Sequence, residues 1–95
     1  MTKEYILDFL KTHKDKLKQD YRLLEIGLFG SYAKDKADEN SDIDIIIKSE
    51  NKDFFLREDL REYLEMHLKK TVDVGYLDSM RDYYKQKIEK DIIYV

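Results

Sequence analysis

Residues 30–47 read GSYAKDKADENSDIDIII, and they join two apolar segments through a turn and a polar loop. The preceding segment, Leu23–Phe29, alternates apolar side chains along its length, which predicts a mostly buried strand. The segment Asp42–Lys48 is rich in β-branched isoleucine, which predicts a second strand. Between them we expect a short helical turn over Tyr32–Ala37 and a polar loop over Asp38–Ser41. The stretch therefore predicts a strand, a tight turn and a second strand in close succession.

The rest of the chain predicts further helices and strands around this stretch. Apolar residues at helical spacing indicate helices, and β-branched runs indicate two more strands. The expected helices are Thr2–Gln19, with Thr2 as its cap, Asp53–Lys69, and a last helix that is capped by Asp78 or Ser79 and carries Met80, Tyr84 and Ile88; the expected strands are Thr71–Leu77 and Ile92–Val95. This order indicates an α+β or α/β domain, with a small mixed β-sheet flanked by helices.

The composition fits one globular domain over residues 1–95. Of the 95 residues, 42% are hydrophobic, a share that a disordered chain lacks. Lysine and arginine number 18 against 21 acidic residues, and the net charge of −3 argues against direct nucleic-acid binding. The absence of cysteine excludes a disulfide scaffold, a thiolate zinc site and a cysteine nucleophile. No apolar run suggests a membrane span or a targeting segment, so we expect a cytoplasmic protein.

Asp42 and Asp44 form the most informative pair of charged residues. Two positions apart in a strand, they should project from the same face, with Cα atoms about 6.5–7 Å apart, while Ile43 points to the core. Like charges so placed repel, and Mg²⁺, which prefers oxygen ligands and phosphates, would offset that repulsion. Taken alone, the pair is equally compatible with two solvated carboxylates at the start of a strand.

Gly30 and Ser31 stand at the end of the first predicted strand and open the helical turn. Backbone N–H groups at the start of a helix bind phosphate, and glycine lets a phosphate approach the backbone closely. The Ser31 hydroxyl adds a hydrogen-bond donor. The alternative is an ordinary strand-to-helix turn in which Ser31 serves as the N-cap.

Asp73 lies between Val72 and Val74 in a short strand with a buried pattern. A carboxylate there costs free energy unless it is paired or coordinated, although an edge strand would leave it in water. If this strand neighbours Asp42–Lys48, three carboxylates face a phosphate cradle. Such a set is typical of two-metal phosphoryl-transfer sites, in which one ion holds the triphosphate and the other activates the attacking hydroxyl.

The run of residues 30–47 resembles the signature of the DNA polymerase β-like nucleotidyltransferases. In this run Gly-Ser is followed, after ten residues, by Asp-x-Asp. This spacing resembles that of the minimal nucleotidyltransferase (MNT) antitoxins, which pair with HEPN-domain toxins. The segments Val72–Val74 and Ile88–Tyr94 also look like that family, so the likeness extends over Leu24–Val95. The resemblance implies the polymerase β-like nucleotidyltransferase fold. It also implies that Gly30 and Ser31 hold the β- and γ-phosphates, and that Asp42 and Asp44 ligate both Mg²⁺ or Mn²⁺ ions. By the same resemblance, Asp73 ligates the catalytic ion and helps to deprotonate the nucleophile.

Lys34 and Asp35 stand where the family commonly has Arg-Gly. Lys34 keeps a cation that could meet phosphate, without the bidentate fork of arginine. Asp35 puts a negative charge near the expected phosphate site and tolerates a left-handed backbone less well than glycine. We therefore expect Lys34 to contribute to nucleotide binding and Asp35 to weaken it. Tyr32, next to Ser31, is a further candidate for lining the nucleotide site.

The resemblance implies three candidate functions. The first is transfer of AMP from ATP to a tyrosine of a cognate HEPN ribonuclease toxin, with which the chain would form a hetero-oligomer. The second is a non-catalytic antitoxin that occludes its toxin; the presence of Asp42, Asp44 and Asp73 together with Gly30 and Ser31 counts against it. The third is a small-molecule nucleotidyltransferase, which the length disfavours because 95 residues leave no second domain to enclose a small acceptor.

Overall fold

The computed structural model describes residues 1–95 and contains four strands, five α-helices and one short 3₁₀ helix. In chain order the elements are α1 (Lys3–Thr12), α2 (Lys14–Asp20), β1 (Leu23–Phe29), α3 (Gly30–Ala33), β2 (Ile43–Ser49), α4 (Phe54–Leu68), β3 (Val72–Tyr76), the 3₁₀ helix η1 (Leu77–Ser79), α5 (Asp82–Glu89) and β4 (Ile93–Tyr94). None of the helices has the length and apolar character that crossing a bilayer requires.

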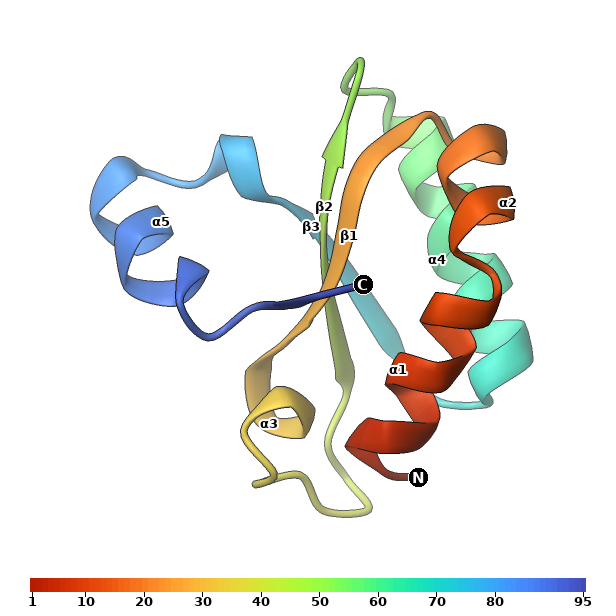
Figure 1. Cartoon of the computed structure of the whole chain (residues 1–95), viewed down its shortest axis with the longest axis vertical. Coiled ribbons are helices and arrows are strands. Elements are labelled where there is room, and N and C mark those ends of the chain that lie inside the picture. The colour runs from red at the N-terminus through yellow and green to blue at the C-terminus, as the bar shows by residue number, and fades with distance from the viewer.

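The strands form one mixed sheet in the order β3-β2-β1-β4. β1 runs antiparallel to both β2 and β4, whereas β2 and β3 are parallel because α4 carries the chain back between them. Figure 1 shows α1, α2 and α4 on one face of the sheet and α5 on the other, with α3 at one end. The expectation of a small mixed sheet flanked by helices is confirmed.

The main core fills the space between the sheet and the helices α1, α2 and α4. The isoleucines of β2 at positions 43, 45 and 47 point into it, as their alternation predicts, and meet the leucines of α4. The opposite face carries only a small apolar cluster of Ile46, Leu77 and Ile92 under α5. The second face is thinly covered, which leaves room there for polar side chains.

Three of the predicted helix boundaries are wrong. The N-terminal helix is interrupted at His13, where the backbone leaves helical geometry and the ring Nδ1 lies 2.8 Å from the Phe9 carbonyl oxygen. The turn after β1 is helical from Gly30 only to Ala33, because Asp35 adopts the left-handed region at φ 58° and ends it. The last helix begins only at Asp82, and no side chain caps it. The expected caps, Asp78 and Ser79, belong to η1 instead, and Met80 lies in the extended segment between η1 and the helix.

Two other local predictions are confirmed. Thr2 caps α1 by accepting a hydrogen bond from the Tyr5 N–H at 3.1 Å. The helix α4 buries Leu60, Leu64 and Leu68 on one face, as their spacing of four residues predicts.

Candidate active site

The pairing of β2 with β3 brings Asp44 and Asp73 together. In this parallel register Asp44 lies opposite Asp73, and Ile43 lies opposite Val72. Adjacent strands lie about 4.8 Å apart, and directly opposed residues project from the same face. The two carboxylates therefore stand next to each other on the thinly covered face of the sheet, and the expectation that the Asp73 strand neighbours the Asp44 strand is confirmed.

Asp42 lies at the margin of this pair, because it precedes the first residue of β2 and is exposed. The pKa of Asp44 is raised, first by burial of its carboxyl group and then by the negative charges of Asp73 and Asp42. The three carboxylates thus form one electrostatic cluster. They form an open cluster, since no three acidic or histidine side chains in the structure close into a set of metal ligands.

Gly30 joins the turn to this cluster. Phe29, the last residue of β1, lies opposite Asp44, so the chain passes the Asp44 carboxylate as it enters α3. Gly30 has φ +79°, and a Cβ on it would overlap Asp44 Oδ2 and lie 3.0 Å from the carboxyl carbon. Only glycine fits both the left-handed backbone and the close approach. The carboxylates and the Gly30–Ser31 turn are therefore parts of one site.

The Ser31 hydroxyl faces no hydrogen-bond acceptor or donor within the chain. The residue is half-buried, and the cap of α3 is Phe29, which makes no side-chain capping bond. The alternative in which Ser31 serves as the N-cap is thus wrong. A hydroxyl that has no structural role beside two carboxylates and a glycine turn is available to bind a phosphate.

Lys34 and Asp35 are both held by charged partners from other elements. The Lys34 amine lies 3.7 Å from an Asp91 carboxylate oxygen, and both side chains are exposed, so the pair contributes at most about 1 kcal/mol. The Asp35 carboxylate pairs at 2.8 Å with Lys3 at the start of α1. The Asp35 side chain is exposed, so this pair screens its charge only in part. Asp35 adopts a left-handed backbone at φ 58°, a conformation that glycine adopts more readily than aspartate.

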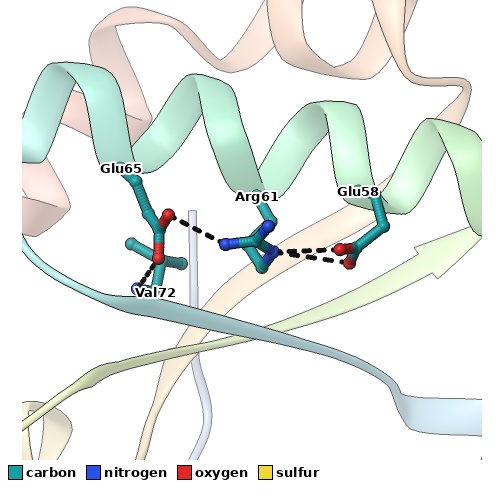
Figure 2. A network of polar contacts seen from close by, with 4 residues as sticks. All are labelled: Glu58, Arg61, Glu65 and Val72. Atoms are coloured by element: carbon teal, nitrogen blue, oxygen red, sulfur yellow. Dashed lines mark hydrogen bonds and ion pairs between the residues drawn. The ribbon is translucent and has the colours of Figure 1, made fainter.

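A network of partly buried charged side chains on α4 holds the start of β3, and no sequence pattern predicted it. Figure 2 shows Arg61 of α4 between Glu58 and Glu65, and Glu65 reaching Val72. The Glu65 carboxylate accepts the Val72 N–H at 2.9 Å and the Arg61 guanidinium at 2.8 Å. The Val72 N–H is the main reason why the pKa of Glu65 is lowered, and Arg61 adds to the effect. Glu65 thereby fixes the backbone of the residue directly before Asp73. The spacing of Arg61 from both glutamates could have indicated the helical ion pairs, but not the bond to β3.

Two hollows in the surface differ in their relation to the carboxylates. One of about 720 Å³ lies between the start of α1, the loop after α3 and the end of α4, on the helix-covered side of the sheet. Tyr32 lines it with a ring that is otherwise buried in the main core, so the expectation that Tyr32 lines the nucleotide site is not supported. The other, of about 320 Å³, is lined by Phe29, Met80, Arg81, Tyr84 and Ile88, and lies on the carboxylate side.

Comparison with known proteins gives consistent matches over nearly the whole chain. A sequence model described as "Nucleotidyltransferase domain" matches residues 10–95. The chain is 34% identical to the protein adenylyltransferase MntA of Thermococcus cleftensis, over 100% of this chain and 97% of that protein. It superposes with a TM-score of 0.72 and 30% identity on a crystal structure of a toxin-antitoxin with AMP-PNP, covering 87% of this chain and 69% of the other.

A further structural match describes a tri-AMPylated Shewanella oneidensis HEPN toxin in complex with an MNT antitoxin. This match has a TM-score of 0.65 and 27% identity, and covers 92% of this chain and 69% of the other. The matched regions include β1, β2 and β3, the three strands that carry or border the carboxylate cluster.

Proposed function

The chain belongs to the nucleotidyltransferase domain family, and from this premise we propose that it transfers AMP from ATP to a tyrosine of a cognate HEPN-domain toxin. The observation that carries the proposal is the register that places Asp44 beside Asp73, with Gly30 packed against the same carboxylate. The relatives supply the donor and the acceptor class: one is a protein adenylyltransferase, and one structural neighbour is an AMPylated HEPN toxin with its MNT antitoxin.

The carboxylate cluster fits divalent cations. Asp44 and Asp73 offer hard oxygen ligands side by side. Burial first, and then the charges of Asp73 and Asp42, raise the pKa of Asp44, and a bound cation would offset both of these costs. We propose that Asp42, Asp44 and Asp73 hold two Mg²⁺ or Mn²⁺ ions. Such ions, when bound, neutralise the charge that develops on the phosphates and raise the reactivity of the attacking hydroxyl.

The protein groups act mainly by positioning the donor. Gly30 lets the phosphates approach the backbone, and the Ser31 hydroxyl donates a hydrogen bond to the β- or γ-phosphate. Lys34 is held by a single exposed ion pair, which a triphosphate can displace, so its amine is available to the phosphates. These contacts orient the bond between the α-phosphorus and the β-phosphate in line with the acceptor.

The reaction exchanges a phosphoanhydride linkage of ATP for a phosphodiester linkage to the acceptor. The tyrosine oxygen attacks the α-phosphorus of ATP and forms a new P–O bond, and the bond from the α-phosphorus to the bridging oxygen breaks. Pyrophosphate leaves with the bonding electron pair, and Asp73 accepts the phenol proton or passes it to solvent. The products are AMP-tyrosine and pyrophosphate, and no oxidant or reductant is needed.

The open position of the cluster favours a protein acceptor. Asp73 is exposed, and one edge of the sheet, β3, has no further strand beside it. A hetero-oligomer with the toxin would cover the cluster from this open side. Because ATP is abundant in the cytoplasm, we propose that the protein acts there.

The experiment mixes the protein with its proposed HEPN-domain partner, together with ATP and Mg²⁺. The partner should gain about 329 Da for each adenylyl group, located on a tyrosine by peptide mass spectrometry. The Asp73→Asn variant should bind the partner equally well but add no mass. If Asp73→Asn protects cells from the toxin as well as the parent does, neutralisation occurs by occlusion and the enzymatic proposal fails.

A further inference from the structure

A mostly apolar groove lies next to the carboxylate cluster and is not used by the phosphate contacts described above. It has a volume of about 320 Å³, and its walls are Phe29 of β1, Met80 and Arg81 of the linker before α5, and Tyr84 and Ile88 of α5. This volume is near the lower end of the range for small-ligand pockets. Figure 1 shows that α5 stands away from the sheet on the face opposite α1, α2 and α4.

The position of Phe29 ties the groove to the site. Phe29 directly precedes Gly30 and lies opposite Asp44 in the β1–β2 register. Opposed residues of antiparallel strands have Cα atoms about 4.5–5.5 Å apart. A nucleotide whose phosphates contact Gly30 and Asp44 therefore has its ribose and base within reach of Phe29. The groove, which Phe29 also lines, offers that base an apolar surface.

The far wall of the groove is anchored yet open to solvent. Ile88 packs against the small cluster of Ile46, Leu77 and Ile92, and Lys85 bonds to Asp78 of η1 at 3.1 Å, so α5 is held in place. By contrast, the Tyr84 side chain is 58% exposed, and Arg81 makes no ion pair with any residue of the chain. An aromatic ring and a guanidinium that serve no structural role are suited to stacking on a planar ligand.

We propose that this groove binds the purine base of the donor nucleotide, with Tyr84 as its main stacking residue; the inference rests on the proposed nucleotidyl transfer. The lining offers two aromatic rings and one guanidinium, but no carboxylate or amide side chain. Recognition therefore depends on stacking area more than on hydrogen bonds to the base edge. A purine presents a larger face than a pyrimidine and binds more tightly for that reason.

The test compares two ligands by isothermal titration calorimetry in the presence of Mg²⁺: ATP, which carries the base, and inorganic tripolyphosphate, which does not. Tyr84→Ala should weaken ATP binding by between about 5-fold and 150-fold, the range found for loss of one base–aromatic stack. The affinity for tripolyphosphate should stay within about twofold, because the phosphate contacts are unaltered. Tyr84→Phe, which keeps the ring, should restore ATP binding.

The matched control is Tyr5→Ala. Tyr5 lies on α1, on the other face of the sheet, and at 55% its exposure nearly equals that of Tyr84. It is preferred to Tyr83, which contacts the Tyr84 ring edge-on at 5.5 Å. Tyr5→Ala should change neither affinity, and the parent should bind ATP and GTP at least about fivefold more tightly than CTP and UTP.

Three outcomes would overturn the inference. Tyr84→Ala could bind ATP as the parent does, it could lose tripolyphosphate binding equally, or the parent could bind purine and pyrimidine triphosphates alike. Failure of the proposed function has a different signature: the parent binds neither ATP nor tripolyphosphate, and this inference then falls with it.

Discussion

Replacing Asp44 with asparagine should stabilise the protein when no divalent cation is present. Asparagine keeps the size of the side chain and removes the charge that Asp73 and Asp42 repel. It also removes the cost of keeping a half-buried carboxylate ionised next to Gly30. The same substitution should abolish the stabilisation that we expect Mg²⁺–ATP to give to the parent, because a proposed ligand of both ions is lost.

The magnitude follows from the register of β2 and β3. Two carboxylates about 5 Å apart repel by about 0.8 kcal/mol in bulk water and by about 3 kcal/mol at an effective dielectric constant of 20. Because Asp73 is exposed and Asp44 is only half-buried, solvent screening brings the expected gain to about 1 kcal/mol. For a chain of this size that gain raises the melting temperature by about 4–8 °C.

The assay is thermal unfolding in EDTA, in Mg²⁺ and in Mg²⁺ with ATP. The control is Asp8→Asn, which removes one negative charge from an exposed position of α1 that has no ion-pair partner. The parent should gain stability with Mg²⁺ and more with Mg²⁺–ATP, as should the control. The reasoning is refuted if Asp44→Asn is no more stable in EDTA than Asp8→Asn, or if it responds to Mg²⁺–ATP like the parent.

Three other substitutions test the surroundings of the cluster. Gly30→Ala should lower stability by at least about 1–2 kcal/mol, because the residue has φ +79° and faces the Asp44 carboxylate; Gly75→Ala, where a Cβ would lie 3.6 Å from Ile46 Cδ1, should be tolerated, and equal melting temperatures would contradict this. Glu65→Gln should lower the melting temperature at pH 7. A carboxyl with a lowered pKa stabilises the fold fully when the pH is above its ordinary pKa of 4.5, and this stabilisation is lost as the pH falls through the lowered pKa. The difference in melting temperature between the parent and the variant should therefore vanish at acidic pH. A difference that persists to pH of about 2 would show that the charge is irrelevant. Asp35→Gly should leave the Mg²⁺–ATP affinity within about twofold in calorimetry, because the carboxylate is exposed to solvent and paired with Lys3; a tenfold gain would show that its charge reaches the triphosphate.

The sequence predicted those features of the site that depend on local pattern. The bounds of β1 match the alternating segment to the residue, because Gly30 takes a left-handed backbone where the strand ends. The isoleucines at positions 43, 45 and 47 of β2 face the main core and leave Asp44 on the opposite face, which follows from the twofold period of a strand. The sequence predicted that Asp44 and Asp73 meet only if their strands are neighbours in the sheet. The structure shows that β2 and β3 are neighbours and that these two residues are paired.

Contacts between distant segments could not be predicted in the same way. The bond from Glu65 to the Val72 N–H depends on how α4 packs across the parallel pair, and the pairing of Asp35 with Lys3 joins residues 32 positions apart. The groove beside Phe29 exists only because the chain between η1 and α5 is extended and carries the helix away from the sheet. Periodicity and capping patterns describe one element at a time, and these features arise between elements.

The central claim, that the carboxylate cluster transfers a nucleotidyl group, is tested most directly by the position of the label that the partner acquires. The HEPN-domain partner is incubated with the protein and Mg²⁺, once with ATP labelled at the α-phosphate and once with ATP labelled at the γ-phosphate. We expect only the α-label to enter the partner, and we expect Asp73→Asn to abolish its incorporation while the complex still forms. Incorporation of the γ-label, or undiminished incorporation of the α-label with Asp73→Asn, would contradict it.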